Sequence, residues 1–88
     1  MSAPESRETR LKRLRIRATH RGIREMDVIL SRFIASALAE LSDAALDEFE
    51  ALLAENDQDL LAWISGRAPP PAQHAGMIGR IAAEAAGF

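Results

Sequence analysis

The apolar residues between Met26 and Leu41 recur at steps of three and four, a spacing that places them on one face of an α-helix. The members of this stripe are Met26, Ile29, Leu30, Phe33, Ala37, Leu38 and Leu41. No stretch of the chain alternates at the period of a β-strand, and most of the apolar residues are alanine and leucine. The sequence therefore predicts an all-α fold, with this helix running without interruption to Leu41.

The residues on either side of this stripe predict a first helix before it and a third helix after it. The first helix runs from about Arg7 to Thr19, has a narrow apolar face and starts at Ser6, whose hydroxyl suits an N-cap. Ser42 is predicted to cap the third helix in the same way. We expect Asn56 to end the third helix in the left-handed conformation.

Glycine and proline divide the last third of the chain. A short fourth helix is predicted to start at Asp57, and Gly66 is expected to close it. A stiff Pro-rich connection at residues 67–72 leads to a last helix over residues 73–86. Two glycines inside that helix lower its stability by about 1 kcal/mol each relative to alanine. We therefore expect it to be the least firmly held element.

Length and composition exclude several classes of protein. The 88 residues allow one small domain with a modest core, so we expect a single five-helix bundle over residues 1–88, flexible at residues 1–6. The chain has no cysteine, and its two histidines, His20 and His74, lie far apart, so no metal site is predicted. No apolar run approaches the ~20 residues of a membrane span. No signal peptide is visible, and we expect a cytoplasmic protein.

Side chains that support catalysis are scarce in this sequence. Cysteine and tyrosine are absent, and His20 has no acid next to it in sequence that would orient its ring. Two acid pairs (Glu48 with Glu50, Asp57 with Asp59) are spaced two residues apart and so do not share a helix face. We read these acids as solvated surface or as helix N-termini. No catalytic residue is predicted, and the chain is not expected to be an enzyme.

Basic residues concentrate at the start of the chain. Residues 1–24 hold eight of the eleven basic residues and two of the thirteen acids, although the whole chain has a net charge of −2. Such asymmetry points to a partner-binding surface. A solvated helix face and an electrostatic partner surface are both open interpretations. The alternatives for function are a small nucleic-acid-associated regulator and an antitoxin-like interaction protein, but no aromatic residue that could stack on bases precedes Phe33.

The segment Arg21-Gly22-Ile23-Arg24-Glu25-Met26-Asp27 joins the first two helical patterns. Gly22 lies between them, where glycine permits a left-handed turn and lets a partner's backbone approach closely. Arg21 and Glu25 are four residues apart and can bracket Gly22 on one surface. The alternative is a simple corner between helices, with acids placed to suit the dipole of the second helix.

This segment resembles the motif of the small flavinylation (FAD assembly) factors of succinate dehydrogenase, which is Arg-Gly-x-x-Glu followed by an acid and an apolar helix. A second block of that family is matched in order and spacing by Phe49, Leu52, Leu53, Asp57, Asp59, Leu60, Trp63 and Gly66. The resemblance covers about residues 10–69. Departures from the family pattern fall at His20, Ile23 and Leu61, outside the Arg-Gly-x-x-Glu core.

The resemblance implies a five-helix assembly factor that binds the flavoprotein subunit of succinate dehydrogenase and, in bacteria, that of fumarate reductase. Such a factor promotes covalent attachment of FAD to a histidine of its client; FAD is then the client's cofactor, and none is expected to be bound stably here. The implied partner-binding residues are Arg21, Gly22, Arg24, Glu25 and Asp27, with Phe33 and Trp63 as core supports. We expect a monomer when free, with no nucleic-acid partner and no membrane insertion.

Overall fold

Five α-helices and one 3₁₀ turn make up the computed structural model of the chain, which describes residues 4–85. The elements are α1 (Arg7–Thr19), α2 (Arg24–Ala37), η1 (Leu38–Glu40), α3 (Asp43–Leu53), α4 (Asp57–Ile64) and α5 (Ala72–Ala85). Residues 4–85 contain no β-strand. The predicted all-α, five-helix fold is confirmed.

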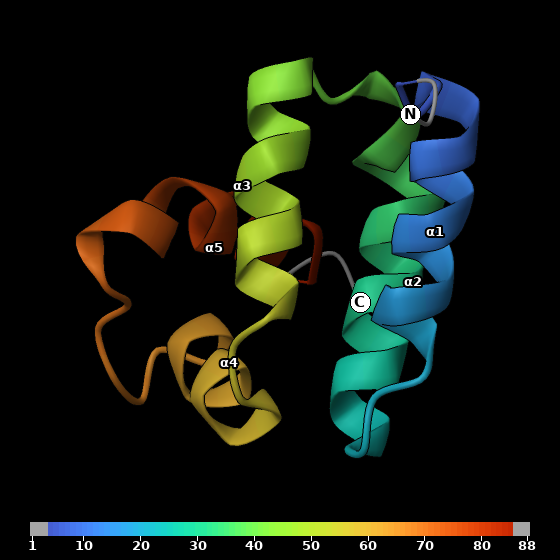
Figure 1. Cartoon of the computed structure of the whole chain (residues 1–88). Coiled ribbons are helices and arrows are strands. Elements are labelled where there is room, and N and C mark those ends of the chain that lie inside the picture. Colours follow the sequence, from blue (N-terminus) through green and yellow to red (C-terminus); the bar gives the residue numbers. More distant parts are fainter. Residues whose placement is uncertain (1–3, 86–88) are drawn as a thin grey trace.

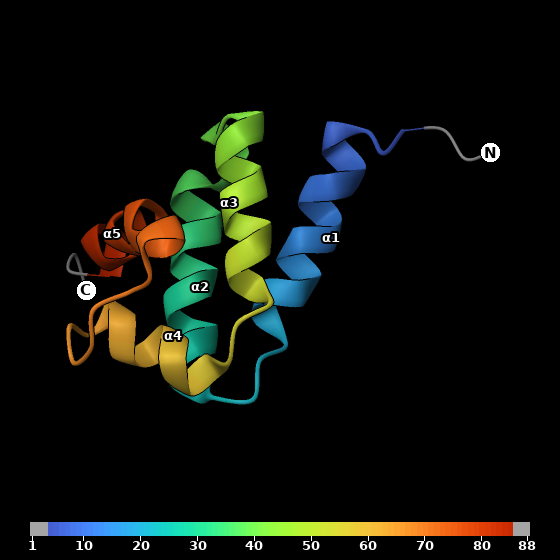
Figure 2. The ribbon, with the colours of Figure 1, turned by 60° about the vertical axis from the view of Figure 1, so that its left-hand side comes forward.

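Helix α2 connects most of the bundle, since it contacts α1, α4 and α5 (Figure 1). Helix α3 packs against α1 and α5. Figure 2 shows the turn between α1 and α2 at the same end of the bundle as the link between α3 and α4. This topology brings Arg21 next to Glu55, although 34 residues separate them in sequence.

The core includes five of the seven side chains of the predicted stripe, and the other two, Ile29 and Ala37, are partly buried. Phe33 of α2 and Phe49 of α3 are buried and stack with ring centroids 5.5 Å apart. The other buried apolar side chains are Leu14, Ala18, Met26, Leu30, Leu38, Leu41, Ala45, Leu46, Leu52, Leu53, Leu60, Met77, Ile78 and Ile81. Each large side chain contributes about 1.5–3 kcal/mol when fully buried, so this core holds the short helices together. Trp63 is partly buried and packs against the core from outside.

Local capping bonds confirm three of the predicted helix boundaries. Ser6 Oγ accepts a hydrogen bond from the Thr9 N–H, and Ser42 Oγ accepts one from the Ala45 N–H, each at 3.1 Å. Gly66 closes α4 with a φ of 81°, the only positive φ in the described part of the chain. The starts of α1 and α3 and the end of α4 are thus determined by residues next to them in sequence.

Two helix ends differ from the prediction. The α-helix α2 stops at Ala37, and a 3₁₀ turn closed by a 3.2 Å bond from the Leu41 N–H to the Leu38 carbonyl follows it. A step of three residues fits both helix types, so the apolar stripe stays buried through the change. Asn56 is extended (φ −67°, ψ 138°) rather than left-handed, and its side chain accepts a bond from the Gln58 N–H at 2.8 Å. It therefore begins α4 and does not end α3.

Some expectations about the chain ends fall partly outside residues 4–85, namely the flexible start at residues 1–6 and the end of the last helix at residue 86. Within the described part, Glu5 pairs with Arg13 of α1. Helix α5 contacts α2, α3 and α4, and its weaker hold on the bundle stays a prediction. Across residues 4–85, no helix is both long enough and apolar enough to cross a membrane.

Candidate partner-binding corner

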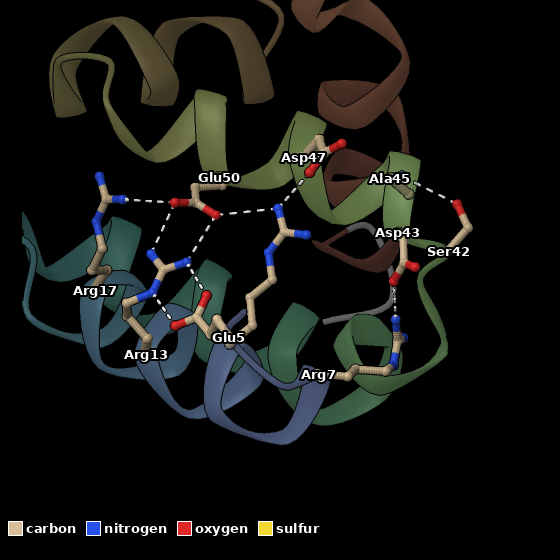
Figure 3. A network of polar contacts seen from close by, with 10 residues as sticks. Glu5, Arg7, Arg13, Arg17, Ser42, Asp43, Ala45, Asp47 and Glu50 are labelled. Atoms are coloured by element: carbon tan, nitrogen blue, oxygen red, sulfur yellow. Dashed lines mark hydrogen bonds and ion pairs between the residues drawn. The ribbon is translucent and has the colours of Figure 1, made fainter. Parts of the chain in front are cut away.

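Most basic side chains of α1 that face α3 are paired with its acids (Figure 3). Arg10 binds Asp47 at 2.6 Å and Glu50 at 3.2 Å. Arg13 lies between Glu5 at 2.9 Å and Glu50 at 2.8 Å. The charge asymmetry of the sequence is therefore largely balanced inside the molecule. These arginines are therefore not a simple solvated face, because their pairing depends on how α1 packs against α3. The interpretation as an electrostatic partner surface stays a prediction.

Glu50 is the centre of this network, and its titration has a consequence for stability. The hydrogen bond from Arg13, with a further bond from Arg10, holds the pKa of Glu50 below its ordinary value of 4.5. A carboxyl group whose pKa is lowered by folding stabilises the protein above its unfolded-state pKa. That stabilisation is lost as the pH falls through the folded-state pKa.

We therefore expect Glu50→Gln to flatten the acid side of the stability curve. Between about pH 5 and pH 3, the unfolding free energy of the wild type should fall more steeply than that of the variant. Urea denaturation at a series of pH values measures both slopes. Glu48→Gln is the control, because Glu48 is exposed on the same helix and makes no ion pair with any described residue. Equal slopes in wild type and Glu50→Gln would contradict the role of this pairing.

Arg21 turns its side chain into the protein. The side chain is 12% exposed, and its Nε donates to Asp57 Oδ1 at 2.6 Å. Its two terminal nitrogens donate to the main-chain oxygens of Leu53, at 2.8 Å, and Glu55, at 3.0 Å. A planar guanidinium is suited to several acceptors at once. Arg21 thus ties the α1–α2 turn to the end of α3, to the start of α4 and to residues 54–56 between them, which we call the link.

Gly22 meets the same carboxylate, because its N–H donates to Asp57 Oδ2 at 3.0 Å. The predicted left-handed turn is wrong, since Gly66 is the only glycine with a positive φ among residues 4–85. The reason lies in Asp27 and Asp57, whose carboxylates accept the N–H groups of Arg21 and Gly22 and so close the turn without such a residue. A Cβ on Gly22 would lie 3.9 Å from Asp57 Oδ2, an ordinary contact.

Arg24 and Glu25 form the outward part of the motif. Both are exposed, and neither makes an ion pair with another described residue. With Val28 and Ile29 they line a shallow hollow of about 320 Å³ in the first turns of α2. Val28 is 45% exposed and gives this hollow an apolar side chain beside the two charged ones. We call Gly22, Arg24, Glu25 and Val28 the corner surface.

The five predicted partner-binding residues therefore divide into two groups. Gly22, Arg24 and Glu25 are exposed, while Arg21 and Asp27 bind within the protein behind them. Asp27 Oδ1 accepts the Arg21 N–H at 3.0 Å and stabilises the turn. The structure thus provides a charged and apolar surface that is held from behind by the hydrogen bonds of Arg21 and Asp27.

Asp57 is the main residue that the sequence interpretation missed, since it was read as a helix N-terminal acid. It holds both Arg21 and Gly22 from 36 and 35 residues away. The one available signal was the resemblance, which placed Asp57 in the second matching block. His20, for which no catalytic role is predicted, is exposed. No group of three or more potential metal-binding side chains occurs in the part of the chain that the structure describes.

Comparison with known proteins extends the resemblance. The model of a family described as "Flavinator of succinate dehydrogenase" matches residues 12–85. Succinate dehydrogenase assembly factor 2, mitochondrial, of Mycosarcoma maydis is 45% identical over 71 residues, covering 81% of this chain and 30% of the relative. The protein of the same name in Meyerozyma guilliermondii is 48% identical over 59 residues, covering 67% and 44%. The FAD assembly factor of Photobacterium profundum is 40% identical over 68 residues, covering 75% and 76%. The chain thus spans less than half of either fungal relative.

Proposed function

The chain belongs to the family of succinate dehydrogenase flavinators, and on this premise we propose that it binds the flavoprotein subunit of that enzyme and promotes covalent attachment of FAD to it. The observation that carries the proposal is the corner surface, exposed on one side and fixed by Arg21 and Asp57 on the other. We propose the flavoprotein subunit of fumarate reductase as a second client of the same surface.

In this proposal the protein helps to position the flavin and the client's histidine, and it contributes no catalytic group. The bond forms between the flavin and a histidine of the client, so the reacting atoms belong to those two. A surface that binds the client best when flavin and histidine are correctly placed raises the population of that arrangement. A corner that is already rigid loses little conformational entropy on docking. FAD is therefore the client's cofactor, and this chain is not an enzyme.

The corner surface offers three kinds of contact. Gly22 leaves room for a close main-chain approach, since nothing extends beyond its Cα. Val28 provides an apolar centre from which the client excludes water. Arg24 and Glu25 at its rim pair with groups of opposite sign and fix the orientation of the client. Together these contacts suit a folded protein surface.

Nucleic acid is not favoured as a partner. Arg7, Arg10 and Arg13 are bound to acids, and phosphate contacts would have to break these pairs. The cytoplasmic location and the monomeric free state expected from the sequence stay predictions.

Charge reversal at Glu25 tests the docking surface. We expect Glu25→Arg to weaken binding to the purified flavoprotein subunit by about tenfold or more, because a repulsive contact replaces an attractive one. The unfolding free energy should fall by only about 1 kcal/mol, because Glu25 is exposed and unpaired among the described residues and loses only its favourable place in the first turn of α2. Titration calorimetry gives the affinity, and urea denaturation gives the stability.

Glu48→Arg is the matched control, because it changes the net charge equally at an exposed position on α3. It should bind the client like the wild type. If Glu25→Arg and Glu48→Arg bound with the same affinity, the corner surface would not be the docking site.

A further inference from the structure

His74 of α5 is the only buried polar side chain in the described part of the chain, with 4% exposure. Its Nε2 lies 2.7 Å from Glu55 Oε2, and its ring stacks on Trp63 of α4 with centroids 5.8 Å apart. A buried polar ring requires a hydrogen-bond partner, and Glu55 supplies it. The partnership joins α5 to the link, since Glu55 lies between α3 and α4.

Glu55 makes one contact through its side chain and another through its main chain. Its side chain binds His74, and its main-chain oxygen accepts a bond from Arg21 at 3.0 Å. Its N–H donates a hydrogen bond at 3.0 Å to the carbonyl of Leu52, a residue of α3. The side-chain contact therefore restrains the same residue whose carbonyl holds the guanidinium of the motif.

We propose that His74 is a positioning residue for the corner surface. By fixing Glu55 it fixes a carbonyl that holds Arg21, and Arg21 and Asp57 in turn hold the turn that carries Gly22. Helix α5 thus contributes to client docking without touching the client. The effect on the client rests on the proposed function, whereas the effect on Arg21 does not.

The exchange of the Arg21 Nε–H with water tests this directly, because this proton is donated to Asp57 and arginine Nε–H groups are observable in nitrogen–proton NMR spectra. We expect His74→Leu, which fills the buried site with an apolar side chain and removes the donor, to speed exchange of this proton with water by about fivefold. His74→Gln should restore slow exchange, since its amide can donate to Glu55. The Gly22 N–H should follow the same pattern.

Ser36→Ala is the matched control, because it also removes a polar contact of α5. Ser36 Oγ donates to Glu84 Oε2 at 2.9 Å, between α2 and α5 and away from the link. Arg21 exchange should stay at the wild-type rate in this variant. Equal acceleration in Ser36→Ala and His74→Leu would show a general loosening of α5 and overturn the proposal, as would an unchanged rate in His74→Leu.

The affinity for the client is the second measurement that tests the proposal. His74→Leu and Glu55→Ala should each weaken binding by about fivefold, and the double variant should be no weaker than either single one because both remove the same contact. Unchanged affinity of His74→Leu for a client that the wild type binds would also overturn the proposal. If the wild type bound no client, the proposed function would fail, and Arg21 exchange would still decide the role of His74.

Discussion

Gly22→Arg is expected to abolish docking on the flavoprotein subunit while the five helices stay folded. Gly22 is exposed, so a long side chain extends over the surface that the client approaches. A side chain that blocks close approach at Gly22 removes the contacts around it, and such a loss weakens binding by about 100-fold or more. Titration calorimetry with the purified client measures the loss, and circular dichroism checks the helices.

Gly22→Ala is the control for size at the same position. A Cβ there lies 3.9 Å from Asp57 Oδ2 and the backbone has no positive φ, so the methyl group fits without strain. We expect a stability near that of the wild type and a much smaller loss of affinity than for arginine. Tight client binding by Gly22→Arg would show that the client docks elsewhere.

Arg21→Ala is expected to act mainly on stability, in contrast to Gly22→Arg. The substitution leaves Asp57, 18% exposed, and the carbonyl oxygens of Leu53 and Glu55 without their charged donor. Breaking such a poorly solvated pair costs about 3 kcal/mol, a large fraction of the stability of a small domain. Urea denaturation measures the loss directly.

Two variants separate the stabilising role of Arg21 from a client contact. Arg21→Lys keeps the charge but lacks the planar fork, so it should recover only part of the stability. Arg24→Ala, at an exposed neighbour, should leave the unfolding free energy within about 0.5 kcal/mol of the wild type. If Arg21→Ala were as stable as the wild type and lost only affinity, Arg21 would be a client contact.

Local signals predicted the helices well. Apolar steps of three and four predicted the buried face of α2, and hydroxyl caps predicted the starts of α1 and α3. Where a local signal has two structural meanings, the prediction was wrong. Asn56 suits both an N-cap and a left-handed end, and the stripe that ends at Leu41 suits both an α-helix and a 3₁₀ turn.

The site was less predictable, because its decisive contacts join distant residues. The resemblance implied Gly22, Arg24 and Glu25 as partner-binding residues, and these residues are exposed. It could not show that Arg21 turns inward, since its acceptors on Leu53, Glu55 and Asp57 lie 32 to 36 residues away in sequence. The pairing of α1 with α3 was missed for the same reason.

Covalently bound flavin is the most direct measure of the central claim, that the corner surface promotes FAD attachment. The assay is the fluorescence of flavin retained by the denatured flavoprotein subunit, in cells that lack their own factor and express this chain. Wild type and Glu48→Arg should restore the fluorescence, and Gly22→Arg, present at equal level, should not. Equal flavin attachment with Gly22→Arg, or none with the wild type, would contradict the claim.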